Sequence, residues 1–160
     1  MEFDENKEEE KYTEDDYVDI YSQRAVFWFS TLFNVIFGGV LLSINLRMAG
    51  FKRAASQILL FSVFYEFVTS FLVRSLNIKF DPAIMKSAQS GIPLTPEQMK
   101  GPLLFVAIVL VLHATGGLIL SRYFFKKYFP DNDYYAKPVL SAVLFAILIT
   151  LVLNVLIGGL

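Results

Sequence analysis

The sequence contains no cysteine and a single histidine, His113, among its 160 residues. Without cysteine there can be no disulfide, thiolate metal site, iron–sulfur cluster or cysteine nucleophile. One histidine is too few for bis-histidine haem ligation within the chain, and it leaves too few ligands for zinc-dependent hydrolysis. The GxSxG elbow, the P-loop and the dinucleotide fingerprint are missing as well. We therefore expect no catalytic residues, no bound metal and no cofactor, and we do not expect an enzyme.

Charged residues are scarce outside the first 20 positions. Ten of the 15 acidic residues lie there, the 14 Lys and Arg residues are scattered along the chain, and the formal net charge is −1. This balance provides no basic face, so nucleic acid is not an expected partner. Residues 1–22 form an acidic tail that is too charged to pack a core, and we predict that it is largely disordered. Docking of this tail onto a basic partner is the alternative interpretation.

Long apolar runs make up most of the remaining sequence, and hydrophobic residues account for 55% of the whole chain. Because a helix needs roughly 20 apolar residues to cross a bilayer, the runs predict transmembrane helices over about 25–46, 54–77, 102–123 and 138–159. The expected fold is all-α: an integral membrane four-helix bundle over 23–160, with an external loop at 78–101. That loop is where we expect contact with a partner outside the membrane.

Lysine and arginine are concentrated in the two short gaps that follow the first and third apolar runs. The residues nearest the predicted helices are Arg47, Lys52, Arg53, Arg122, Lys126 and Lys127. Since basic residues favour the cytoplasmic side of a membrane, this density predicts both short loops inside and both termini outside. Binding of anionic lipid head groups is the functional alternative for the same six residues.

Paired glycines occur in the first and third runs in the same local pattern. Gly38-Gly39 and Gly116-Gly117 are each followed by a Leu-Ser pair and then by a basic loop. The pattern suggests two similar helical hairpins related by an axis along the membrane normal, and chance similarity between packed helices is the alternative. Together with Gly158, these glycines are expected to pack helices, because small residues let backbones approach closely.

Small and polar residues in the apolar runs fall on one face of each predicted helix when they are placed at about 100° per residue. These faces contain Ser30, Asn34, Gly38 and Asn45; Ser62, Glu66, Thr69 and Ser70; His113, Gly116 and Gly117; and Thr150, Asn154 and Gly158. Polar side chains hydrogen-bond across helix contacts in membranes. We therefore expect the four faces to turn toward one another or toward a second copy of the protein.

Glu66 is the only acidic residue inside an apolar run, and it lies near the middle of that run. An ionised carboxylate at this depth costs a few kcal/mol on insertion scales, and such residues are functional candidates for that reason. His113 and Asn34 lie at similar depth in two other runs, so a contact of Glu66 with His113, with Asn34 nearby, is geometrically possible. The group either carries protons or binds a cation, or it is a satisfied polar core that fixes the helix register. For Asn34, and for His113 taken alone, the second interpretation is preferred.

The segment 21–50 resembles a pattern found in uncharacterised small bacterial membrane proteins. It consists of an apolar helix containing FGG at 37–39, then LL at 41–42, then Asn45 and a short basic turn. The resemblance implies a multi-pass protein of the bacterial inner membrane. It implies no activity and no functional residue.

Two functions follow from these observations. The leading hypothesis is a small non-enzymatic membrane protein that binds, stabilises, regulates or neutralises a protein partner in the membrane. The alternative is an oligomeric transporter or channel in which Glu66 couples to protons or cations. The expected partners are the lipid bilayer and either a membrane protein or a second copy of the chain.

Overall fold

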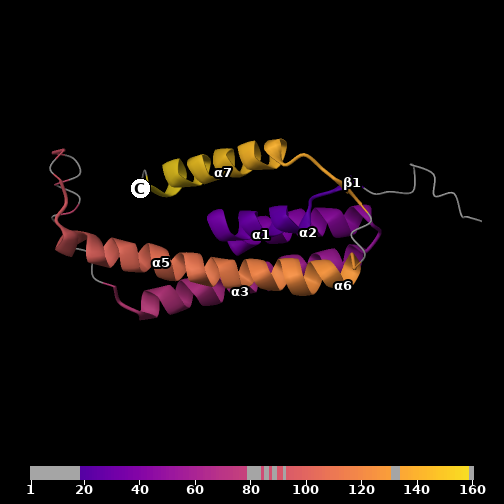
Figure 1. Cartoon of the computed structure of the whole chain (residues 1–160), viewed down its shortest axis with the longest axis horizontal. Coiled ribbons are helices and arrows are strands. Elements are labelled where there is room, and N and C mark those ends of the chain that lie inside the picture. The colour runs from indigo at the N-terminus through magenta and orange to yellow at the C-terminus, as the bar shows by residue number, and fades with distance from the viewer. Residues whose placement is uncertain are drawn as a thin grey trace, which may run out of the picture.

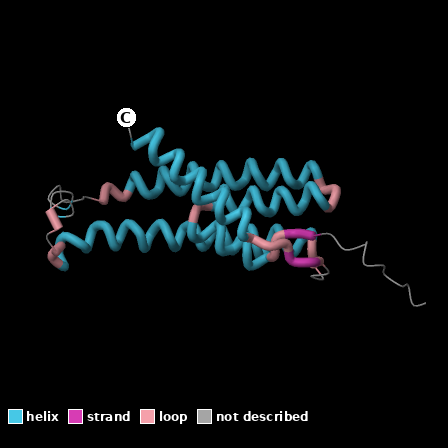
Figure 2. Tube along the Cα trace, turned by 90° about the horizontal axis from the view of Figure 1, so that it is seen from above, coloured by secondary structure: helices cyan, strands magenta, loops and turns pink. Residues whose placement is uncertain are grey.

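The computed structural model describes residues 19–78, 84, 87, 90–91, 93–130 and 134–158, with side chains of 153–154 and 156–158 left out. Helices make up most of this part of the chain, which confirms the all-α prediction. Its one strand pairing is a parallel two-residue bridge between β1 (Asp19–Ile20) and β2 (Tyr135–Ala136), and Figure 2 shows the two strands side by side. Most of the acidic tail and much of the predicted loop at 78–101 lie outside the described residues.

The first apolar run is not one helix. It forms α1 (Gln23–Leu32) and α2 (Val35–Met48), which are antiparallel and make a helical hairpin. The direction is fixed by Asn45 near the end of α2, which hydrogen-bonds the backbone of Tyr21 just before α1 begins. The continuous helix predicted over 25–46 is therefore wrong.

Asn34 is the physical reason for the break. Its backbone is extended, and its side-chain Oδ1 accepts a hydrogen bond from the Phe37 N–H at 3.1 Å, so it caps the start of α2. Asparagine is among the strongest N-cap residues, because its side-chain oxygen accepts a hydrogen bond from a backbone N–H of the first turn that has no partner within the helix. The sequence instead predicted Asn34 on the polar face of a single helix over 25–46.

The base of the hairpin is closed by both ends of the Asn45 side chain. Oδ1 accepts from the Tyr21 N–H at 2.8 Å, and Nδ2 donates to the Tyr21 carbonyl at 2.7 Å. Asn45 is fully buried. The side-chain amide of Asn45 thereby satisfies the buried N–H and the buried carbonyl of Tyr21, which lie outside the helices and strands.

Two long helices run antiparallel beside the hairpin (Figure 1). They are α3 (Lys52–Ser75) and a continuous helix formed by α5 (Pro96–Leu118), the π-helical segment η2 (Ile119–Phe125) and α6 (Lys126–Tyr128). α5 begins six residues before the predicted start at 102, because Thr95 and Gln98 form a capping box and Pro96 occupies the first turn. The last helix, α7 (Leu140–Gly158), packs mainly through Ala146 and neighbouring apolar residues.

The two long helices are long and apolar enough to cross a membrane: Lys52–Ser75 and Pro96–Tyr128. Only 17% and 22% of their most apolar windows are buried within the protein. The core helix of a water-soluble domain would be mostly buried, so this exposure favours contact with lipid. Val35–Met48 and Leu140–Val152 are apolar but shorter. The four crossings of the predicted bundle stay a prediction.

The paired glycines lie in helices of different length. Gly38 and Gly39 are in α2, which has 14 residues, whereas Gly116 and Gly117 are in α5, which continues into η2 and α6. Both segments run toward the end of the molecule that carries β1 (Figure 1). The suggested duplication of helical hairpins stays a prediction. The two glycine-containing helices differ in their surroundings, since α2 follows the short α1 whereas α5 continues into η2.

Candidate functional site

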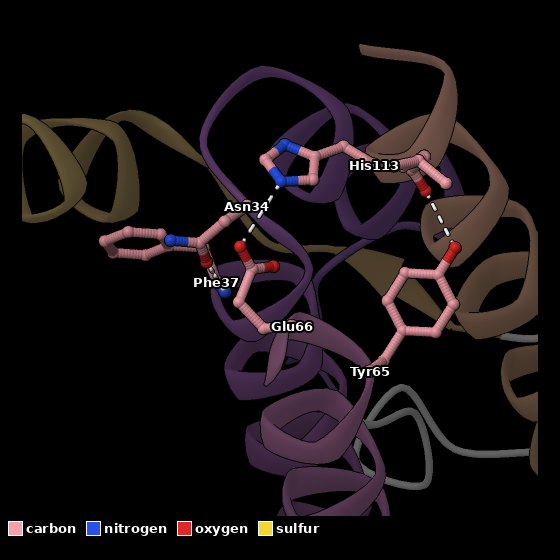
Figure 3. A network of polar contacts seen from close by, with 6 residues as sticks. Asn34, Phe37, Tyr65, Glu66 and His113 are labelled. Carbon is pink, nitrogen blue, oxygen red and sulfur yellow. Dashed lines mark hydrogen bonds and ion pairs between the residues drawn. The ribbon is translucent and has the colours of Figure 1, made fainter. Parts of the chain in front are cut away.

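Glu66 and His113 meet at the centre of the molecule. Glu66 lies in the middle of α3 and His113 in the middle of the long α5–α6 helix, and Glu66 Oε1 is 3.4 Å from His113 Nε2. Figure 3 shows the carboxylate directed at the imidazole ring. The side chains are only 23% and 10% exposed. The contact expected between these two residues is therefore present, and it joins the two longest helices.

The second carboxylate oxygen has no such partner. Glu66 Oε2 is buried and makes no hydrogen bond with any residue in the described part of the chain. A buried polar atom without a partner is costly and uncommon, and it often marks a functional position. The pair is thus half satisfied: one oxygen faces an imidazole, and the other can still take up a proton or a hydrogen bond.

Tyr65 positions the two helices next to this pair. Its hydroxyl donates to the Leu112 carbonyl at 2.8 Å, immediately before His113 in sequence. Figure 3 shows this bond beside the Glu66–His113 contact. The bond holds α3 and α5 at one level, so neighbouring Glu66 and His113 face each other. Tyr65 was not among the predicted site residues, although a tyrosine hydroxyl within an apolar run needs a partner.

The tip of the hairpin lies at the level of the pair. A Cβ placed on Gly116, one turn after His113, would meet the Val35 side chain and would lie 2.7 Å from Tyr65 Cε1. The first turn of α2 is thus packed between the two helices that supply Glu66 and His113. The first amides of a helix have no partner within it and carry a partial positive charge.

Asn34 lies beside Glu66 in Figure 3, but its Oδ1 is used to cap α2. In the structure Asn34 thus serves as the N-cap of α2. A role in proton or cation coupling stays a prediction. Asn154 and Gly158, which share the predicted face of the last helix, have side-chain positions outside the described residues.

The other predicted packing glycines lie at close helix contacts. A Cβ on Gly38 would collide with Ser30 Oγ and lie 2.7 Å from the Val26 carbonyl oxygen, across the hairpin. A Cβ on Gly117 would lie 3.0 Å from Ser30 Cβ, and one on Gly39 would collide with Ser62. These glycines permit backbone approach, as small residues do in membrane helices. Most residues of the first three predicted polar faces are buried, so these three faces turn inward. On the last helix Thr150 is exposed, and the inward orientation of that face stays a prediction.

A wider turn follows the site along the same helix. Residues Ile119–Phe125 form a π-helix, η2. In this segment the Ser121 carbonyl accepts a hydrogen bond from Gln23 Nε2 at 3.0 Å, which ties the start of α1 to the long helix. π-helical turns within α-helices are rare and frequently lie near functional sites.

The six basic residues predicted as lipid head-group ligands are exposed. They lie in the last turns of α2 and η2, the first turn of α3 and in α6, at the β1 end of the molecule. Lys52 and Arg53 line a cavity of about 440 Å³ together with Phe51 and Tyr128. Binding of head groups by Arg47, Lys52, Arg53, Arg122, Lys126 and Lys127 stays a prediction.

Among the described residues, no three His, Cys, Asp or Glu side chains lie close enough together to hold a metal ion. Glu66 and His113 alone offer fewer ligands than structural or catalytic zinc sites use. What the pair can do chemically is exchange or share a proton, since both groups are titratable and are in contact.

The comparisons with known proteins provide no family. No protein-family model matches the chain, and no curated protein or solved structure is significantly similar to it. The bacterial inner-membrane location implied by the resemblance of 21–50 therefore stays a prediction.

Proposed function

We propose that the chain is an integral membrane protein in which Glu66 and His113 form a proton-coupling site, and that it works as an oligomeric transporter or channel. The observation that carries the proposal is the buried Glu66 Oε2, which has no hydrogen-bond partner in the described part of the chain while Oε1 faces His113. Intramembrane carboxylates and histidines mark proton relays in pumps and transporters. A small bundle encloses little space for a pathway, so an assembly of several copies is part of the proposal.

The proposed topology is a re-entrant hairpin followed by three crossings. α1 and α2 enter the bilayer and return to the same side, and α3, the α5–α6 helix and α7 each cross it. Irregular backbone at membrane depth is tolerated where protein covers it, and broken helices near the midplane commonly form transport sites. In this arrangement Asp19 and the end of α7 lie on opposite sides, as they lie at opposite ends in Figure 1. This topology replaces the one with four crossings and both termini outside.

The donor set favours a proton over a metal cation. One oxygen of the only carboxylate faces a nitrogen, 3.4 Å away. Hard cations such as Ca²⁺ prefer six or more oxygen ligands. A satisfied polar core that only fixes the helix register is the competing interpretation of the pair. The unpartnered Oε2 argues against it, because a core selected for stability would satisfy both oxygens.

Proton flux in lipid vesicles tests the proposal. Purified protein is reconstituted, a pH gradient is imposed, and flux is compared for the parent, Glu66→Gln and His113→Gln. We expect flux from the parent and loss of most of it in Glu66→Gln, because an amide cannot exchange a proton at this position. The matched control is Glu97→Gln, which makes the same change on the exposed first turn of α5. Equal flux for the parent and Glu66→Gln, or none for any variant, would contradict proton coupling.

The hypothesis of an accessory membrane subunit stays a prediction, since no contact or cavity in the described residues favours a protein partner over lipid. The mass of the purified particle separates the two functions. A particle made of copies of this chain fits the transporter, whereas a tightly bound foreign chain without flux fits the accessory subunit.

A further inference from the structure

A second candidate site, which contains neither Glu66 nor His113, lies between the hairpin and α7. A partly open cavity of about 540 Å³ lies there, lined mostly by apolar side chains of both elements. Val40, Leu41 and Ile44 form the α2 wall, and Ala142, Phe145 and Ile149 form the α7 wall. Volumes of this size are typical of sites that bury a small ligand.

The cavity is elongated along α2. Its lining extends from Asn34 at the hairpin tip to Ile44 near the hairpin base. At 1.5 Å of rise per residue, these ten steps correspond to about 15 Å, or roughly half of the hydrocarbon thickness of a bilayer. A cavity of this length and polarity fits a single extended hydrocarbon chain that reaches from one membrane surface to the midplane.

One end of the cavity is basic. Tyr21 lines the cavity at the hairpin base, and Lys137 Nζ lies 5.6 Å from the centre of its ring. Lys137 is held there because its backbone N–H donates to the Ile20 carbonyl at 2.9 Å. This bond places the lysine at β1, at the end of the molecule where α2 and η2 end and α3 begins. A cation at the membrane surface above an apolar channel is complementary to an anionic head group attached to an acyl chain.

We propose that this cavity holds one acyl chain of an anionic phospholipid from the bilayer, with the phosphate near Lys137 and the chain end near Asn34. The charge at one end and the length of the apolar lining identify the ligand. The proposal depends on membrane embedding but does not depend on proton coupling, so the flux of Glu66→Gln has no bearing on it.

Native mass spectrometry tests the site directly. The parent is reconstituted in vesicles of equal parts phosphatidylglycerol and phosphatidylcholine, extracted in mild detergent, and the lipids retained per chain are counted. We expect one retained lipid, with phosphatidylglycerol preferred about fivefold, which is the effect of one lysine near an anionic head group. Lys137→Gln should remove this preference and keep the retention, because the apolar walls are unchanged.

Filling the cavity should abolish retention. Ala142→Phe adds a ring from the α7 wall, and Val40→Phe adds one from the α2 wall, so the test survives if one of them does not fold. Leu144→Phe is the matched control, because Leu144 lies on α7 with its side chain 61% exposed and outside the cavity lining. Unchanged retention in both filled variants, equal retention of the two lipids by the parent, or a lipid-free dimer in the spectrum would each overturn the proposal.

Discussion

The hairpin and α7 are packed in different ways. Eight residues of α2 are buried, including two glycines and Asn45, and polar side chains of the hairpin bond backbone atoms. In the described side chains of α7 only Ala146 is buried, and a large apolar cavity separates α7 from α2. The centre of the protein is therefore fixed by specific contacts, whereas α7 is held by fewer of them. Regions of low contact density are the ones that open first and move most easily.

We expect the largest loss of stability from Asn45→Ala, in the tightly packed hairpin. The substitution removes both hydrogen bonds to Tyr21 and leaves a buried N–H and a buried carbonyl without partners. At about 1–3 kcal/mol for each buried group, we expect a loss of roughly 2–6 kcal/mol in the free energy of unfolding. Unfolding in mixed micelles, followed by the fluorescence of Trp28, measures it. Ser56→Ala, on the exposed face of α3, should change the free energy little.

A smaller effect is expected where two helices approach most closely. Gly39→Ala places a methyl group against Ser62, and overpacking of this kind costs about 1–3 kcal/mol. The next atom, the Ile58 carbonyl oxygen, is 3.8 Å away, so removing the Ser62 side chain should relieve the collision. In a double-mutant cycle, Ser62→Gly should therefore recover most of the loss. A strictly additive cycle would show that the two positions do not touch.

The smallest effect should come from α7. Leu42 in α2 is completely buried, whereas Leu148 in α7 is 58% exposed. We expect Leu42→Ala to cost about 1–3 kcal/mol, less than in a soluble core because the unfolded helix keeps its side chain in lipid. Leu148→Ala should cost under about 0.5 kcal/mol. Equal losses at the two positions would show that α7 is packed as tightly as the hairpin.

Sequence patterns predict the helical class, the inward-facing glycines and the contact of Glu66 with His113. These follow from helical spacing and from the cost of a carboxylate in lipid, both of which are local properties. The break at Asn34 does not follow from them. The run 25–46 is long enough for one crossing and contains no proline, and an asparagine within it can serve a packed helix or cap a new one.

Hydrogen bonds between residues far apart in sequence decide whether the run 25–46 forms one helix or two. Asn45 and Tyr21 are 24 residues apart, and Tyr65 reaches the Leu112 carbonyl, 47 residues away. Their partners are backbone atoms, which carry no residue-specific pattern. Long-range bonds of this type fix how the hairpin folds back, and they are visible only in the structure.

The turn at the hairpin tip also affects how the chain would enter a membrane. Asp19 and the basic loops lie at the same end of the molecule (Figure 1). A segment that enters and leaves through one face does not require the acidic residues before it to be carried through the hydrocarbon. The first stretch to be translocated is then the one after α3.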